Sequence, residues 1–437
     1  MHASARQTGS SLALLVVISV HLLTTAGLWL AMDQAEYLFA AERLVRNHTL
    51  TLAEAGSGRL ARVPWVPVEP SEPVRFRMLP LTPVALAPLV ALDLALGFGG
   101  PERTGLLVHM LGHLLVFAAL AILALTLRVA GASERATAFA VAATGLSWPV
   151  WHVSRRGGAE PVLIVLVALF LLGGELRRRR GHGPGLTLQC LALLLMPWAH
   201  ATGPLIGLVL LMGEALHGIG PPHRRALWVL LLALAIGEVS LIGVWNIGYH
   251  GNWWGGGYGR YYASRPMLGV RAFLPGLVLH LGSLGLEGPV LLLVAAATLR
   301  ARRLEGHQAI ARAALLSLAL SAFFATFHQV EPTRRLAAVW PAWGLAAGLA
   351  FDRIASWRIA PRVLLLVAGL VSFHWFLVID GRFYLGPGGL FYPAVLWIRQ
   401  VLEFGASAAT LAPPLALALL LIVAALRLGR MLGPSPS

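Results

Sequence analysis

The sequence lacks several residues and motifs on which common functional classes depend. Its 437 residues contain no lysine, one cysteine (Cys190) and only 12% charged residues. A single cysteine excludes an intramolecular disulfide and a thiolate metal cluster. We also find no Walker loop, dinucleotide-binding fingerprint, HExxH motif or nucleic-acid-binding motif, so chemistry on soluble nucleotides has no support and no nucleic-acid partner is expected.

Apolar residues dominate what is present. They make up 57% of the chain and form long runs that do not alternate with polar residues, a pattern that predicts spanning α-helices rather than a β-barrel. We expect an all-α polytopic membrane protein, a single integral membrane domain over 1–437 with about 12 transmembrane helices (roughly 11 to 13). The clearer spans are 12–31, 104–127, 136–153, 161–176, 186–199, 203–217, 226–247, 271–299, 313–328, 336–351, 362–379 and 409–426.

Two of these spans, 186–199 and 203–217, are short and are separated by a break at Met196–Pro204. Broken helices at membrane depth are tolerated where they face protein or a cavity.

The positive charge consists entirely of arginine, and the formal net charge is +15. Membrane lipids with anionic headgroups are the first partners that such a balance suggests. If each span crosses the membrane once, most of the arginine clusters lie on the same side. The positive-inside rule makes that side cytoplasmic. These clusters are Arg177–Arg180, Arg224 with Arg225, the arginines of 300–312, those of 353–362, and Arg427 with Arg430.

A stretch that follows the first span directly, Met32 to Val45, predicts an amphipathic helix on the membrane surface. Asp33, Tyr37, Ala40 and Arg43 would share one face, and Leu38, Ala41 and Val45 another. Acids at the start of a helix also interact favourably with its dipole, so an ordinary solvated helix start explains the pattern equally well.

The segment Leu79 to Gly97 decides the side on which this helix lies. If it does not cross the membrane, the polar segment 33–77 is extracytoplasmic; if it crosses, that segment is cytoplasmic. Acids and arginines balance within 33–77, so charge leaves both arrangements open. The three prolines within 79–97 favour the arrangement without a crossing.

Two arginine pairs break the positive-inside rule. Arg155–Arg156 and Arg334–Arg335 fall on the extracytoplasmic side in either arrangement. Adjacent guanidinium groups suit a phosphate, which they can bind through paired hydrogen bonds. Pairing with the nearby Glu160 and Glu331 is the alternative explanation.

Further polar residues map to the same face when 79–97 does not cross. They include Asp33, Glu36, Glu160, His200 and the glycine-rich aromatic loop 246–262. A carboxylate that takes a proton from an acceptor hydroxyl, together with cations that stabilise a departing phosphate, is what group transfer from a phosphate leaving group requires.

Several short motifs resemble those of the GT-C glycosyltransferases of bacterial membranes, which include the lipid-linked aminoarabinose transferases and the protein O-mannosyltransferases. The likeness covers most of the chain in order. The matching stretches are Asp33-Gln34-Ala35-Glu36-Tyr37, Arg77–Leu81, Ser154–Pro161, Trp245-Asn246 with Tyr249–Asn252, and Glu331–Leu336.

This resemblance implies transfer of a sugar from a polyprenyl-phosphate donor to a lipid, glycan or protein acceptor. It implies a multi-pass protein of the bacterial cytoplasmic (inner) membrane whose active site faces outside. The segment 33–103 would be the first extracytoplasmic loop with juxtamembrane helices, and 247–270 and 380–408 would be further loops. His200 is a departure, because many relatives have a basic residue for the lipid phosphate there.

The implied site has three groups of residues. Asp33 is the catalytic base, and Glu36 and Glu160 are further acidic positions. The donor phosphate is held by Arg155, Arg156, His200, Arg334 and Arg335, and the substrate loop residues are Tyr37, Asn246, Tyr249 and Arg260. No cofactor is expected, nor a divalent metal, because the sequence has no dense carboxylate cluster.

Two other classes of function stay open on the sequence. A transporter or flippase for an anionic lipid or solute would also use the arginine pairs and the broken helices. A membrane ligase or polymerase with a lipid-pyrophosphate donor would place its functional residues in a large late loop, here 380–408.

Overall fold

The computed structural model shows a bundle of helices. It describes residues 8–23, 32–52, 74–75, 79–95, 104–154, 158–180, 182–215, 221–251, 253, 304–326 and 336–354, and positions 273, 274, 276, 277, 280, 281, 284 and 291. The predicted spans 362–379 and 409–426 and the predicted loop 380–408 lie outside the described residues.

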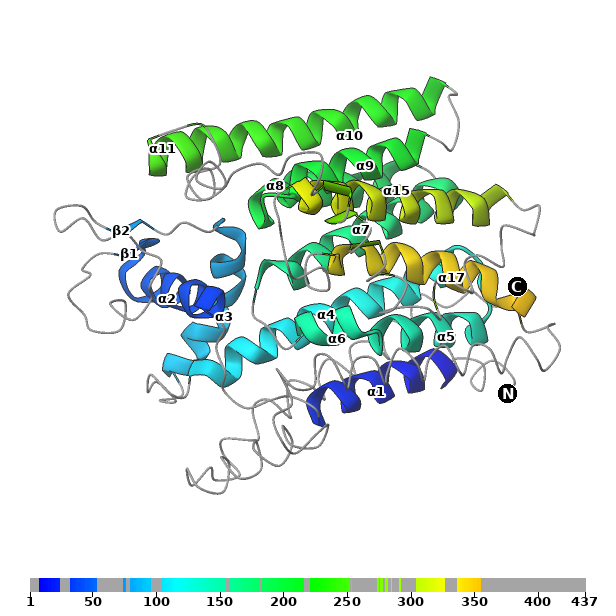
Figure 1. The fold of residues 1–437 in the computed structure, drawn as a ribbon, viewed down its shortest axis with the longest axis horizontal. Coiled ribbons are helices and arrows are strands. Elements are labelled where there is room, and N and C mark those ends of the chain that lie inside the picture. The colour runs from blue at the N-terminus through cyan, green and yellow to red at the C-terminus, as the bar shows by residue number, and fades with distance from the viewer. Residues whose placement is uncertain are drawn as a thin grey trace.

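Helices account for nearly all of the described chain (Figure 1). Beside them is one antiparallel ribbon, in which β1 (Thr51–Leu52) pairs with β2 (Val74–Arg75). The helices are α1 (Thr8–Leu23), α2 (Met32–Asn47), α3 (Leu81–Ala95), α4 (Thr104–Val129), α5 (Glu134–Gly145), α6 (Trp148–Ser154), α7 (Ala159–Arg180), α8 (His182–Ala199), α9 (Gly203–Ala215), α10 (Pro221–Ser240), the π-helix η3 (Leu241–Ile247), α11 (Gly248–His250), α15 (Leu304–Thr326), the 3-10 helix η4 (Ala337–Val339) and α17 (Trp340–Ile354).

Four of the described helical segments are long and apolar enough to cross a membrane: Leu111–Val129, Ala159–Arg179, Pro222–His250 and His307–Thr326. Shorter apolar helices lie beside them in Figure 1. The chain is therefore a helical, multi-pass membrane protein, and the predicted total of about 12 spans stays a prediction.

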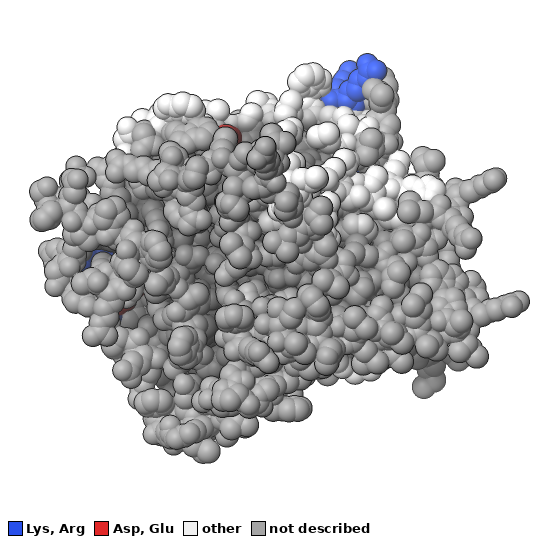
Figure 2. All heavy atoms as spheres, viewed as in Figure 1, with Lys and Arg blue, Asp and Glu red and all other residues white. Residues whose placement is uncertain are grey.

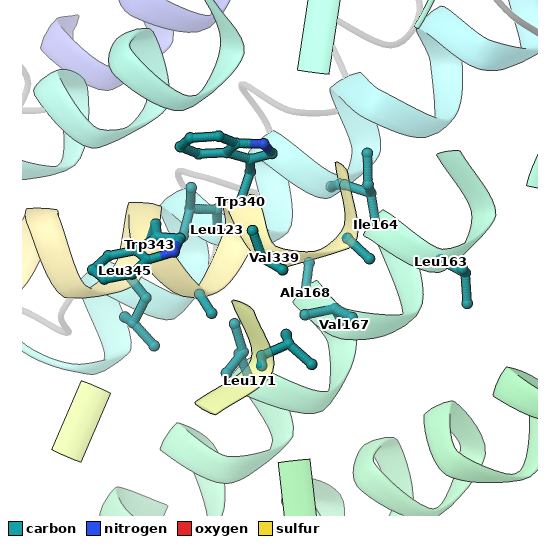
Figure 3. Close-up of a cluster of buried hydrophobic side chains, with 14 of the residues drawn as sticks. Leu123, Leu163, Ile164, Val167, Ala168, Leu171, Val339, Trp340, Trp343 and Leu345 are labelled. Carbon is teal, nitrogen blue, oxygen red and sulfur yellow. The ribbon is translucent and has the colours of Figure 1, made fainter. Parts of the chain in front are cut away.

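α7 forms the centre of the bundle and α10 its edge. The apolar window of α7 is 83% buried within the protein, whereas that of α10 is only 22% buried, so α10 presents its apolar side chains outward. Membrane lipid is the apolar environment that such a surface requires. Figure 3 shows the core around α7. Side chains of α7 lie there near side chains of α4, η4 and α17. The α7 residues are Leu163, Ile164, Val167, Ala168 and Leu171, and the others are Leu123, Val339, Trp340, Trp343 and Leu345.

α7 and α8 approach each other closely because glycine lines their contact. A Cβ atom placed on Gly185 would lie 2.4 Å from the carbonyl oxygen of Gly173. No side chain fits at that separation, so the two backbones touch as they do in small-residue interfaces of membrane helices.

The break predicted near Met196–Pro204 is confirmed, since α8 ends at Ala199 and α9 begins at Gly203. The two helices run antiparallel. Gln189 near the start of α8 contacts Arg177, and so does Glu214 near the end of α9. The break is therefore a turn at one end of the bundle rather than an interruption within one spanning helix.

The prediction of one helix over 136–153 is wrong. The structure has α5 and α6 there, separated at Leu146 and Ser147. Pro149 has no N–H, so the carbonyl of Gly145 has no donor four residues later. His21 of α1 contacts that oxygen through its Nε2 atom at 2.6 Å, and its Nδ1 lies 2.9 Å from Ser154 Oγ at the end of α6.

We expect replacement of His21 with leucine to lower the free energy of unfolding by about 1–3 kcal/mol, because the buried carbonyl of Gly145 loses its donor. His21→Gln should retain much of that stability, since its amide nitrogen can donate in the position of Nε2. Denaturant titration in detergent micelles measures both variants. Equal losses in the leucine and glutamine variants would contradict the hydrogen-bonding role.

Candidate functional site

One end of the bundle carries α2 and α3, and we call it the α2 end. A second hydrophobic cluster of the protein lies there, separate from the core around α7. Its buried members come from five elements or the segments beside them, and we call it the α2 cluster: Tyr37, Leu38, Ala40, Ala41, Leu79, Leu86, Val90, Leu111, Ala159, Leu241 and Trp245. The cluster joins segments up to 208 positions apart in the sequence (Tyr37 to Trp245) at a single end of the bundle.

The helix expected after the first span is present as α2. Its burial differs from the expectation, because Tyr37 and Ala40 of the supposed polar face are as buried as Leu38 and Ala41. The reason is α3, which packs against α2 through the α2 cluster. The backbone places Asp33 at the second residue of α2, one helical turn before Tyr37.

Glu160 lies at the start of α7. It is 5% exposed and follows Ala159, a member of the α2 cluster. An acid in the first turn of a helix faces the positive end of the helix dipole, which stabilises its charged form. A carboxylate is thus held at the α2 end on a helix separate from α2.

His200 lies in the turn between α8 and α9, and it is buried. The backbone N–H of Thr202 donates to His200 Nδ1 at 3.2 Å, and Thr202 Oγ1 lies 2.9 Å from the same nitrogen. Because Nδ1 accepts a hydrogen bond, the neutral ring carries its proton on Nε2. The turn therefore fixes both the tautomer and the orientation of the imidazole.

The segment after α10 adds an aromatic group to this end. The rings of Trp245 and Tyr249 stack with centroids 4.1 Å apart and planes 7° apart. Tyr249 Oη donates to the carbonyl of Leu50 at 2.8 Å, which ties α11 to the segment after α2. α11 ends at His250 and is followed by Gly251, whose φ of +72° is the left-handed conformation that favours glycine.

We expect Tyr249→Phe to weaken this tie by about 1 kcal/mol, because it removes the hydrogen bond and leaves the stacked ring. Hydrogen exchange should then be faster at residues 48–52 than in the wild-type protein. Tyr249→Leu is the companion variant, which also removes the stack and should have a larger effect. Unchanged exchange in the phenylalanine variant would contradict the tie.

The structure brings together five of the predicted site residues at the α2 end: Tyr37, Glu160, His200, Asn246 and Tyr249. The backbone of α2 places Asp33 and Glu36 at the same end. The remaining predicted site residues, Arg155, Arg156, Arg260, Arg334 and Arg335, lie outside the described residues. Within the described ranges, no group of three or more His, Cys, Asp or Glu side chains is arranged to hold a metal ion.

Sequence reasoning missed a buried ionic cluster at the opposite end, which we call the Glu214 cluster. Glu214 is fully buried and contacts Arg177 Nη2 through Oε2. Its Oε1 lies 3.2 Å from Arg178 Nη1 and 3.2 Å from Arg312 Nη2. An acid near the end of an apolar run was the available signal, because such a residue needs a partner at membrane depth.

Glu175 pairs with Arg178 beside Glu214, and two further side chains extend the Glu214 cluster. Arg177 Nε donates to Gln189 Oε1 at 3.0 Å, and Arg177 Nη1 donates to His223 Nδ1 at 3.1 Å. His223 therefore carries its proton on Nε2, which donates to the carbonyl of Glu214 at 2.9 Å. The cluster joins α7, α8, α9, α10 and α15.

Known proteins give one informative comparison. No protein-family model matches the sequence, and no curated protein matches it either. The structure is similar to the crystal structure of ArnT from Cupriavidus metallidurans bound to undecaprenyl phosphate. The TM-score is 0.56 at 17% sequence identity, and the match covers 96% of this chain and 77% of that one. The chain therefore has the fold of ArnT, which confirms the predicted resemblance at the level of the fold.

Proposed function

We propose that the protein is a GT-C glycosyltransferase that moves a sugar from a polyprenyl-phosphate donor to a lipid, glycan or protein acceptor. The observation that carries the proposal is the ArnT fold over 96% of the chain, since the ArnT structure holds undecaprenyl phosphate. The α2 end adds support, because it gathers acids, a buried histidine and aromatic residues from distant parts of the sequence. The residues of the site define the mechanism.

The reaction is a single displacement with inversion at the anomeric carbon. Asp33 takes the proton of the acceptor hydroxyl while the hydroxyl oxygen forms a bond to that carbon. The bond from the carbon to the phosphate oxygen breaks, and polyprenyl phosphate leaves with the electron pair. Glu36 and Glu160 support the acidic side of the site, and Tyr37, Asn246, Tyr249 and Arg260 contact the substrates.

Arg155, Arg156, Arg334, Arg335 and His200 bind the donor phosphate in this proposal. Cations stabilise the negative charge that develops on the departing phosphate. Guanidinium groups suit this task because their planar fork can donate two hydrogen bonds to one phosphate. Thr202 fixes the orientation of the His200 imidazole within this group.

We further propose that the α2 end faces the outside of the bacterial cytoplasmic membrane. The opposite end carries Arg177 and Arg178 at the end of α7 and the exposed Arg224 and Arg225 at the start of α10. Basic patches of this kind face the cytoplasm. Figure 2 shows blue side chains at the upper right, where α10 begins.

The place of α3 supports an extracytoplasmic first loop. Its Leu86 and Val90 pack in the α2 cluster, and Figure 1 shows α3 next to α2 at one end of the bundle. We therefore propose that 79–97 does not cross the membrane and that 33–103 is a loop with juxtamembrane helices. The segments 247–270 and 380–408 are the other proposed external loops.

The test uses purified protein in lipid vesicles with radiolabelled undecaprenyl-phosphate sugars and an extract of bacterial envelope acceptors. The proposal predicts that label leaves the lipid, appears in a product and is matched by released undecaprenyl phosphate. Movement of labelled lipid between leaflets with the sugar still attached would instead identify a flippase and overturn the proposal.

A further inference from the structure

The helix that carries Trp245 and Asn246 departs from α-helical geometry. α10 continues into the π-helix η3 over Leu241–Ile247. π-helical turns are rare, and they occur often at functional sites because the wider turn re-aims side chains. Trp245 and Asn246 are both buried in this segment, at 6% and 4% exposure.

Each of these two residues has a buried polar atom without a partner. Trp245 Nε1 and Asn246 Oδ1 make no hydrogen bond to any residue that the structure describes. An unsatisfied buried polar group costs about 1–3 kcal/mol, so two of them in adjacent residues need a physical explanation. A ligand that supplies the missing partners is one.

The surrounding contacts hold both side chains in place. Asn246 Nδ2 donates to the carbonyl of Trp253 at 3.2 Å, so the other amide atom is the oxygen, an acceptor. The stack on Tyr249 holds the Trp245 ring, and its indole nitrogen can only donate. The pair thus offers one donor and one acceptor, both held in place before a ligand arrives.

That combination selects among the parts of a polyprenyl-phosphate sugar. The prenyl chain has no polar atom, and the phosphodiester has acceptor oxygens but no O–H to donate to Asn246 Oδ1. Sugar hydroxyls both donate and accept, so they alone satisfy both atoms. Trp245 also belongs to the α2 cluster with Tyr37 and with Ala159, the neighbour of Glu160.

We propose that Trp245 Nε1 and Asn246 Oδ1 bind hydroxyl groups of the donor's sugar and select glycosylated lipid over bare polyprenyl phosphate. This inference rests on the proposed function and adds a sugar-specific site to it. Trp245 is not among the residues that the sequence predicted for the site.

The test compares the binding of two kinds of lipid to the full-length protein in nanodiscs. The probes are undecaprenyl phosphate and undecaprenyl phosphate that carries glucose, mannose or arabinose. Trp245→Phe keeps an aromatic ring against Tyr249 and removes the N–H. It should weaken binding of the preferred glycosylated lipid about tenfold, the loss expected for one buried hydrogen bond, and leave bare undecaprenyl phosphate unchanged.

Trp228→Phe is the matched control, because Trp228 lies on α10 with 70% exposure. It should bind both lipids as the wild-type protein does. Asn246→Leu should reproduce the selective loss, and thermal unfolding checks that each variant is folded.

Three results would overturn the inference while the wild-type protein still binds undecaprenyl phosphate. In the first, Trp245→Phe loses the same amount of affinity for both kinds of lipid. In the second, it loses no affinity for either. In the third, the wild-type protein binds no glycosylated lipid more tightly than bare undecaprenyl phosphate. A wild-type protein that binds none of the lipids would overturn the proposed function as well.

Discussion

Asparagine in place of Asp33 is expected to lower kcat for sugar transfer by about 10²–10⁴-fold, the usual contribution of a general base. The amide has nearly the size of the carboxylate but cannot take the proton of the acceptor hydroxyl. Donor binding should change little, because the arginines and His200 are proposed to hold the phosphate. The measurement is turnover with saturating undecaprenyl-phosphate sugar, combined with donor affinity for the same variant.

Glu42→Gln is the control for Asp33→Asn. Glu42 lies on the same helix and pairs with the exposed Arg46 at 2.8 Å, so the same loss of charge occurs away from the helix start. Its turnover should equal that of the wild-type protein. Wild-type turnover in Asp33→Asn would remove Asp33 from the role of base. A loss in Glu160→Gln alone would transfer that role to Glu160.

Glutamine in place of Glu214 is expected to lower the free energy of unfolding by about 3–5 kcal/mol, because it removes the carboxylate from buried arginines. Arg177 and Arg312 are both almost fully buried. Their guanidinium charges would then lack compensation from Glu214. All five helices that the Glu214 cluster joins should be destabilised.

Denaturant titration in mixed micelles measures this loss, with Glu42→Gln as the matched control. That exposed pair should contribute no more than about 0.5 kcal/mol. Glu214→Asp keeps the charge and should restore part of the stability. A Glu214→Gln variant as stable as the Glu42→Gln variant would show that water or rearranged side chains compensate the arginines.

Hydrophobic pattern and proline positions were enough to predict most of the described helices. The Pro197 and Pro204 region predicts the break between α8 and α9, which the structure has as a turn at one end of the bundle. The break between α5 and α6 could not be predicted from the local sequence alone. Pro149 signals it, but the donor that satisfies the Gly145 carbonyl is His21, 124 positions earlier. Local sequence does not reveal a partner that distant.

The same distinction holds for the candidate site, where some features follow from the sequence and others depend on tertiary packing. Counting spans places Glu160, His200 and Asn246 on one face, and the structure has them at one end of the bundle. The burial of Tyr37 and Trp245 depends on how α2, α3 and η3 pack together. Sequence periodicity indicates which side of one helix is apolar, but not which second helix covers it. Glu214 was missed for the same reason, since its three arginines come from α7 and α15.

Photo-crosslinking tests the central claim most directly. The probe is an undecaprenyl-phosphate sugar with a diazirine on the sugar, added to the protein in nanodiscs and followed by mass spectrometry of the labelled peptides. We predict that labelling is lost with excess unmodified donor and falls on the α2 end, within 32–52, 158–163 or 241–253. Competed labelling confined to the Glu214 cluster, at 175–180, 212–225 or 308–314, would contradict the account.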